Sequence, residues 1–262
     1  MQERSSANGG AKEWWRDARC HFAPLAINHP LLRDRSDLAP AIAFLTSLPG
    51  LPTGASVLDL GCGPGRYSVE LALRGYAVVG LDINAEFVAS AQELAAQEAV
   101  ELELLTGDMR EIPFRERFDL ALSLGTSFGF FDDEADDRRV IAGVARSLKR
   151  GGRFVLEMGN RDYFLGHFVA RDWTRLEDGR TRILERRFDA ARGRIDTQFE
   201  VVGGAGAVER WAHSWRAYTL TEILGMLRDA GLLIKRVAGG WRGEAYSVEA
   251  PRMVVVAAKP SA

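Results

Sequence analysis

Apolar runs and amphipathic segments alternate along residues 55–160. Short runs rich in Val, Leu, Ile and Phe predict five buried strands, at residues 56–60, 77–81, 101–106, 118–124 and 153–158. Apolar positions recur at helical spacing between them, in segments 67–74, 85–97 and around 140–148. Strands that alternate with helices in this way form βαβ units with right-handed crossovers and a parallel sheet. The pattern therefore predicts a doubly wound α/β fold.

Glycines and short polar residues mark the expected helix ends. Gly75 follows segment 67–74, and Gly151-Gly152 follow the segment around 140–148, so we expect each helix to end there. The sequence Thr219-Leu-Thr-Glu222 has the form of a capping box and predicts a further helix, which Gly231 ends. The pattern closes with two more apolar runs, at 233–237 and 253–258.

The alternation of strands and helices stops after Gly159. Three strand-like segments follow, separated by glycine-containing turns, at 182–188, 194–202 and 209–218. We interpret them as a small antiparallel sheet inserted into the main one, and as a candidate surface for a substrate or for a second copy of the chain. The predicted units are an N-terminal helical cap, a first part of the core, the insertion and the rest of the core, at 1–54, 55–160, 161–218 and 219–262.

Composition narrows the possible partners. Hydrophobic residues make up 47% and charged residues 27% of the chain, as in an ordinary globular protein. The net charge of −2 argues against nucleic acid as a partner, because proteins that neutralise phosphates usually carry a basic excess. The two cysteines and four scattered histidines suggest neither a disulfide framework nor a metal site. No apolar run approaches a membrane span or a signal peptide, so we expect a cytoplasmic protein with no membrane partner.

A glycine-rich loop joins the first predicted strand to the first helix. Gly61, Gly63 and Gly65 let the backbone turn sharply and approach a ligand closely, at the strand end where open α/β sheets bind ligands. A dinucleotide fingerprint is the alternative, but Arg66 stands where that motif requires its third glycine. Asp59 precedes the loop, where it would repel a pyrophosphate and attract a cationic ligand.

The next strands also end in residues that suit a nucleoside. Asp82 ends the second strand, where a carboxylate can accept both ribose hydroxyls; as a helix N-cap, Asn84 is better placed. Asp108 ends the third strand and is a candidate acceptor from an adenine amino group, with Met109 packed on the ring. Ile83 and Leu124 complete the expected contacts. Each feature alone also fits an ordinary turn, but together they occupy consecutive strand ends.

With these motifs the chain resembles the class I S-adenosylmethionine (SAM)-dependent methyltransferases, from about residue 55 to the C-terminus. The resemblance implies a Rossmann-like seven-stranded sheet whose last strand is antiparallel, and SAM as the cofactor. It is closer still to bacterial small-molecule methyltransferases with a β insertion after the fifth strand, including sugar N-methyltransferases. It implies that Asp59, Gly61, Gly63, Gly65, Asp82, Ile83, Asp108, Met109 and Leu124 contact SAM.

The motifs say little about the residues that contact the methyl acceptor. We expect these residues mainly on the insertion and on the loop after the fourth strand. His213 is the first candidate for a general base, because a histidine titrates near neutral pH; a histidine packed between tryptophans is an equal alternative. Tyr163 is a second catalytic candidate. The expected substrate contacts are Trp15, Phe128, Trp211, Trp215 and Arg216.

The sequence leaves several functions open. We expect methyl transfer to nitrogen or oxygen of a small molecule, with a homodimer through the inserted sheet as a possible assembly. The loop after the fourth strand has no Asn-Pro-Pro-Tyr-like tetrapeptide, which disfavours nucleic-acid methylation. The alternatives are a non-catalytic SAM-binding protein and an NAD(P)-dependent oxidoreductase.

Overall fold

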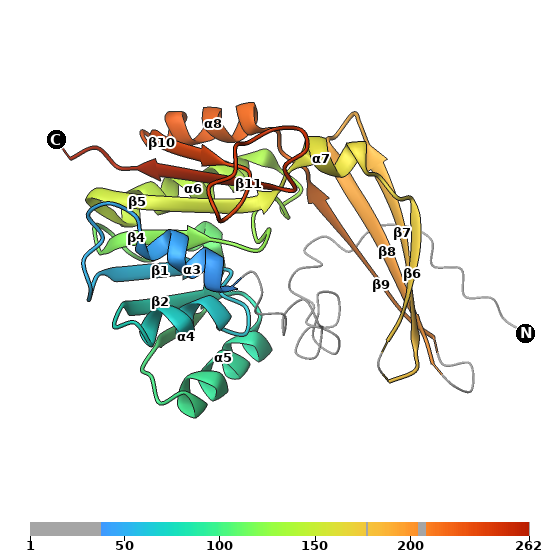
Figure 1. Ribbon diagram of the computed structural model, residues 1–262, viewed down its shortest axis with the longest axis horizontal. Coiled ribbons are helices and arrows are strands. Elements are labelled where there is room, and N and C mark those ends of the chain that lie inside the picture. Colours follow the sequence, from blue (N-terminus) through green and yellow to red (C-terminus); the bar gives the residue numbers. More distant parts are fainter. Residues whose placement is uncertain (1–37, 177, 204–207, 262) are drawn as a thin grey trace, which may run out of the picture.

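The computed structural model describes residues 38–176, 178–203 and 208–261 and contains two sheets (Figure 1). The main sheet has seven strands in the order β10-β11-β5-β4-β1-β2-β3. All neighbouring pairs are parallel except those of β11, which runs antiparallel to β5 and β10. The predicted seven-stranded sheet with an antiparallel last strand is therefore confirmed. Its strands are β1 Ser56–Leu60, β2 Ala77–Asp82, β3 Glu103–Thr106, β4 Phe118–Ser123, β5 Leu148–Gly159, β10 Leu233–Ala238 and β11 Arg252–Ala258.

Helices cover both faces of the main sheet because its strands carry apolar side chains on both faces. One buried cluster joins the sheet to α6 and α8, and a second joins it to α3 and α4. Helix α3 falls within the cap predicted for residues 1–54, yet it packs onto the core through Ile42 and Leu45. The helices are α3 Leu38–Thr46, α4 Arg66–Ala72, α5 Ala85–Gln97, α6 Glu134–Ser147, α7 Arg161–Gly166 and α8 Leu220–Asp229, with a 3-10 turn, η2, at Met109–Glu111.

Side-chain caps begin the helices that the sequence marked. The Asn84 carboxamide oxygen accepts from the backbone N–H of Glu86 at 2.9 Å, so Asn84 rather than Asp82 caps α5. Thr219 and Glu222 form both hydrogen bonds of the predicted capping box at α8. These bonds satisfy backbone donors that a helix cannot satisfy internally.

The main sheet differs from the sequence prediction at the start of β5. Leu148 was expected to lie in the preceding helix, but α6 ends at Ser147 and Leu148 pairs with Phe118 as the first residue of β5. Gly151 and Gly152 therefore lie within β5, and the register of β5 against β4 shifts between Leu148 and Arg153. A Cβ on Gly152 would lie 3.0 Å from the Phe118 carbonyl oxygen, and this close backbone approach explains the glycine.

The inserted sheet has four strands, in the order β6-β7-β8-β9, where the sequence predicted three (Figure 1). They are β6 Arg171–Arg175, β7 Thr181–Asp189, β8 Arg194–Val202 and β9 Val208–Arg216. The sequence did not reveal β6 because all five of its residues are exposed and show no apolar alternation. Figure 1 shows this sheet beside the core, joined to it through α7 and the end of β9. No helix in the described ranges is long and apolar enough to span a membrane.

Candidate functional site

A cavity of about 390 Å³ lies at the carboxyl ends of β1, β2 and β4, where an open α/β sheet binds ligands. Eight of the nine predicted cofactor contacts line it: Asp59, Gly61, Gly63, Asp82, Ile83, Asp108, Met109 and Leu124. The loops that carry them are separated in sequence by up to 65 residues. The parallel sheet therefore brings them to one edge, as the strand pattern predicted.

The glycine loop presents bare backbone to this cavity. Gly61 and Gly63 have φ angles of +67° and +55°, which side chains rarely adopt. A Cβ on Gly61 would lie 2.7 Å from the Ser127 Cβ, so the loops after β1 and β4 meet closely. A Cβ on Gly63 would meet nothing within 4 Å and would therefore occupy space available to a ligand.

Gly65, the ninth predicted contact, does not line the cavity. Its φ is +84°, and an added Cβ would lie 2.7 Å from the Cβ of Ala91 on α5. The third glycine of the motif thus lets α4 start directly against α5. Its observed contacts are those of helix packing, and its contact with SAM stays a prediction.

Two carboxylates, one buried and one half-buried, border the glycine loop. Asp59 is 2% exposed and accepts from the Ser68 hydroxyl at 2.6 Å; burial raises its pKa to about 6. Asp82 accepts from the backbone N–H of Gly63 at 2.8 Å and of Asn84 at 2.9 Å, and burial raises its pKa as well. Each carboxylate still has lone pairs for further donors. Both favour a ligand that brings positive charge or hydroxyl groups.

Asp108 has partners that the sequence did not indicate. Both of its oxygens accept from the Arg110 guanidinium, the shortest contact being 2.7 Å, and one oxygen also accepts from the Arg110 backbone N–H at 2.9 Å. The hydrogen bonds that Arg110 donates to Asp108 and Asp136 raise its pKa. The predicted adenine acceptor is therefore already tied to a cation at the edge of the cavity, while Met109 beside it lines the wall.

The rest of the wall includes three residues that sequence reasoning did not identify, Arg66, Tyr67 and Arg252. It also includes Thr126, Ser127, Phe130 and Phe131 from the loop after β4, where the acceptor side was expected. This loop is unusual, because Thr126 has a φ of +61°. Glu157, 1% exposed, holds this loop by accepting from the Gly125 backbone N–H at 2.6 Å. Its other oxygen accepts from Arg252 at 2.6 Å. Gly125 and Gly129, both in this loop, were the available sequence signal.

Phe128, a predicted substrate contact, is not part of the wall. Its side chain is fully buried, with its ring centroid 5.7 Å from that of Tyr218. The next two residues, Phe130 and Phe131, line the cavity instead. Three phenylalanines in four positions could not be distinguished from sequence, because their orientation depends on a loop with two left-handed glycines.

His213 and Trp211 lie together on one face of the inserted sheet, outside the wall of this cavity. Trp211 stacks on Phe199 with ring centroids 5.4 Å apart, and His213 lies 4.9 Å from the same ring. Burial, with a smaller effect of Arg186, lowers the pKa of His213 to about 4. The imidazole is therefore neutral near pH 7 and a weak base, as in the alternative of a packed histidine.

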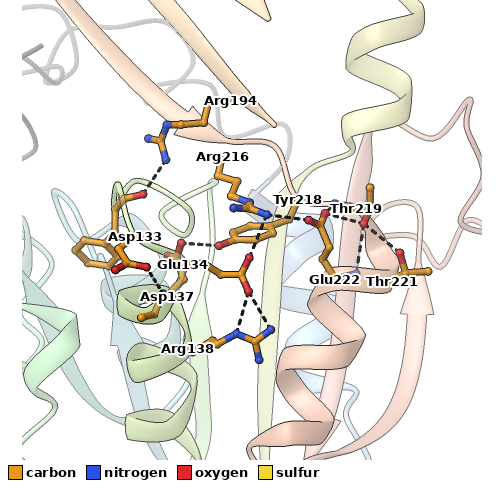
Figure 2. A network of polar contacts seen from close by, with 12 residues as sticks. Asp133, Glu134, Asp137, Arg138, Arg194, Arg216, Tyr218, Thr219, Thr221 and Glu222 are labelled. Carbon is orange, nitrogen blue, oxygen red and sulfur yellow. Dashed lines mark hydrogen bonds and ion pairs between the residues drawn. The ribbon is translucent and has the colours of Figure 1, made fainter. Parts of the chain in front are cut away.

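The other acceptor-side candidates also have structural partners. Trp215 packs edge-on against Phe164, and Tyr163 stacks on His167 with ring centroids 4.2 Å apart. Arg216 forms ion pairs of 3.0 Å with Glu134 and Glu222, at the N-termini of α6 and α8 (Figure 2). None of these three lines the cavity, and Trp15 lies outside the described residues. No group of three or more potential metal ligands occurs in the described part of the chain.

Comparisons with known proteins agree with this architecture. A family model described as a methyltransferase domain matches residues 57–152. The cypemycin N-terminal methyltransferase of a Streptomyces species is 30% identical over 205 residues, which are 78% of this chain and 82% of that protein. A SAM-dependent methyltransferase from Clostridium acetobutylicum has a TM-score of 0.77 at 18% identity, covering 89% of this chain and 96% of its own.

A second solved structure has a similar fold. SAM-bound CalS10, an amino pentose methyltransferase from Micromonospora echinaspora, has a TM-score of 0.61 at 23% identity, covering 89% of this chain and 96% of its own. With the sequence relative above and the seven-stranded sheet, these similarities show that the chain belongs to the class I SAM-dependent methyltransferases.

Proposed function

We propose that this protein transfers the methyl group of SAM to a nitrogen or oxygen of a small-molecule acceptor by direct displacement. The observation that carries the proposal is the cavity in which the open space beside Gly63 is bordered by the buried carboxylate of Asp59 and the half-buried carboxylate of Asp82. A cavity of this size suits a nucleoside-sized ligand.

The residues present fit SAM. Asp82 keeps lone pairs for two ribose hydroxyls while it holds Gly63 and Asn84. Ile83, Phe87 and Met109 offer apolar surface for a purine ring. Asp59 supplies negative charge near the glycine loop, where the positive charge of the cofactor lowers the free energy of the ionised carboxylate. A dinucleotide fits less well, because the same carboxylates would repel its pyrophosphate.

Bound SAM supplies an activated methyl group on a positively charged sulfur. The protein then has to align the acceptor with the methyl carbon and exclude water. An alcohol must also lose a proton as it attacks, whereas a neutral amine attacks with its lone pair. The carboxylates in the described wall, Asp59, Asp82 and Asp108, all belong to the loops assigned to the cofactor.

We therefore favour an amine acceptor over an alcohol. The described wall contains no histidine, and the pKa of His213 is too low for an effective base at neutral pH. The name of one similar protein, the cypemycin N-terminal methyltransferase, supports the same choice. Incubation with methyl-labelled SAM and matched panels of amines and alcohols tests it. Labelling of alcohols alone would contradict the preference for nitrogen.

Isothermal titration calorimetry tests cofactor binding directly. We expect micromolar affinity for SAM, a severe loss in Asp82→Ala and Gly63→Val, and no change in the surface control Asp229→Ala, whose carboxylate is 68% exposed. Unchanged affinity in both site variants would rule out this site. NAD(P)H fluorescence tests the oxidoreductase alternative. SAM binding without a labelled product from any acceptor pool would favour a non-catalytic SAM-binding protein.

We further propose a homodimer through the inserted sheet, with a small molecule as the other partner. Edge strand β6 is exposed along its length, so its backbone can pair with another strand, and its large aromatic side chain Trp173 is 68% exposed. Light scattering after size-exclusion chromatography should give twice the monomer mass for the wild type and a lower mass for Trp173→Ser. A monomeric wild-type protein would refute the proposal.

A further inference from the structure

The side chain of Arg194 reaches from the inserted sheet to the loop that forms one wall of the cavity. Arg194 begins β8, and its guanidinium donates to the carbonyl oxygens of Phe131 at 2.7 Å and Phe130 at 3.4 Å. It also donates to the hydroxyl of Ser214 at 2.8 Å and the carbonyl of Ser214 at 3.0 Å, both on β9. One buried side chain thus joins two strands of the insertion to two residues that line the cavity.

Burying a charged guanidinium costs free energy unless hydrogen bonds replace those to water. Arg194 is 2% exposed, and burial lowers its pKa from the ordinary value, although an arginine keeps its charge. Its ion pair among the described residues is a long one of 4.0 Å, to Asp132. The four acceptors within hydrogen-bond distance are neutral oxygens. A planar guanidinium bonded at several points fixes the distances between those oxygens.

The same loop is held to the insertion at a second point. Gly129 accepts from the Arg216 backbone N–H at 2.7 Å, and a Cβ on Gly129 would lie 2.9 Å from the Arg216 carbonyl oxygen. Arg216 is itself fixed by Glu134 and Glu222, as Figure 2 shows beside Arg194. The loop after β4 therefore cannot move without the end of β9.

We propose that Arg194 is a positioning residue, which fixes the Phe130–Phe131 wall of the cavity to the inserted sheet, and that this wall borders the acceptor end of the cavity and determines which groups fit beyond the cofactor sulfur. The inference rests on the proposed function, because it takes the cavity to hold SAM. The insertion then controls acceptor selection from outside the cavity, through backbone contacts, with no need for its own aromatic side chains to touch the acceptor.

SAM analogues with a larger alkyl group on sulfur test this without a known acceptor, because that group projects into the acceptor side. Calorimetry gives the affinity for SAM and for the S-butyl analogue. In the wild type, the fixed wall should disfavour the butyl group. In Arg194→Met the ratio of the affinity for SAM to the affinity for the S-butyl analogue should fall about tenfold. The affinity for SAM itself should stay within about threefold of the wild-type value. Arg194→Lys, with fewer donors, should lie between the two. Arg192→Met, an exposed arginine of the same turn, should match the wild type.

Ser214→Ala removes one of the four hydrogen bonds of Arg194 and provides a milder variant if Arg194→Met fails to fold. It should shift the ratio of the two affinities in the same direction. A purely structural role would lower the melting temperature of these variants and leave the ratio of the two affinities unchanged. An unchanged ratio in the folded variants overturns the proposal. Failure of the wild type to bind SAM overturns the proposed function instead, so the two failures are distinguishable.

Discussion

The carboxylate of Asp82 accepts a hydrogen bond from the backbone N–H of Gly63 at 2.8 Å and so connects the tips of β2 and β1. Its other oxygen accepts from the N–H of Asn84 at 2.9 Å, directly before α5. One side chain thus orients the glycine loop and the entry to a helix before any ligand binds. The ribose-binding role proposed for Asp82 depends on this preformed geometry.

Asp82→Asn tests that geometry with a nearly isosteric change. The amide retains one acceptor oxygen but turns an NH2 group toward a backbone N–H, so two donors face each other. The unfavourable contact should cost about 1–3 kcal/mol and lower SAM affinity at least about tenfold. Calorimetry and thermal unfolding measure the two effects, with Asp229→Asn as the exposed control. Wild-type affinity in Asp82→Asn would show that ionisation of Asp82 is not needed.

Asp59 should make SAM binding depend on pH. Burial raises its pKa to about 6, so at pH 5 the carboxyl is mostly protonated. The positively charged cofactor favours the ionised form, and binding at low pH therefore releases a proton. SAM affinity should rise between pH 5 and 7, by less than about tenfold per pH unit, and then level off.

Calorimetry in two buffers with different ionisation enthalpies measures the released proton at pH 5.5. In Asp59→Asn both the proton release and this part of the pH dependence should disappear. Equal proton release in the variant and the wild type would assign the effect to another group.

Gly65 and Gly54 form a matched pair for separating backbone strain from crowding. Both have left-handed φ angles, +84° and +83°, but a Cβ on Gly65 would lie 2.7 Å from Ala91, whereas one on Gly54 would meet nothing within 4 Å. Gly54→Ala should cost about 1 kcal/mol for the φ angle alone. Gly65→Ala should cost about 3 kcal/mol, because overpacking against α5 adds to the strain. Urea unfolding gives both values, and equal losses would mean that α5 adjusts freely.

Local signals explain how much of this site was predictable from the sequence. The run before Asp59 and the run before Asp82 are short and apolar, so they indicate strands, and the parallel sheet then places both ends at one edge. The caps at Asn84 and Thr219 are similarly local, since each bond spans two or three residues. Glycine positions indicated where backbone borders the cavity, as it does at Gly61 and Gly63.

The rest depends on contacts between distant parts of the chain, which no local pattern encodes. Gly65 has the same motif context as Gly63 but faces a helix that begins 20 residues later. Arg194 lies 63 residues from Phe131, its partner in the cavity wall. The aromatic residues of β9 suggested a substrate surface, yet Trp211 and His213 pack on Phe199 from the neighbouring strand. Strand β6 had no apolar pattern at all.

Asp137 should make the folded protein less stable as the pH rises. It is fully buried, accepts from the Tyr218 hydroxyl at 2.7 Å, and burial raises its pKa from 3.8 to about 7. The native state therefore holds this proton over a range in which the unfolded chain has lost it. The stabilisation that the protonated Asp137 gives the folded protein is complete below about pH 4 and is lost as the pH approaches and passes 7.

Asp137→Asn isolates this contribution, because an amide does not titrate. The free energy of unfolding of the wild type, relative to the variant, should fall by roughly 2–3 kcal/mol between pH 5 and 7.5. Urea unfolding at several pH values gives the difference, in which the other titrating groups cancel. Parallel curves for the two proteins would show that Asp137 keeps an ordinary pKa.

His213 should remain neutral throughout the physiological pH range. Its ring packs beside Phe199, and burial, reinforced by the positive charge of Arg186 and only weakly opposed by Asp196, lowers its pKa to about 4. The imidazole proton signals in NMR should therefore not shift between pH 5.5 and 8, with His213→Gln identifying the resonance by its loss. A midpoint near 6.5, the ordinary value for histidine, would mean that the ring reaches solvent. Such a histidine could accept a proton near neutral pH, but it lies outside the described cavity wall, so the preference for an amine acceptor would rest on the wall residues alone.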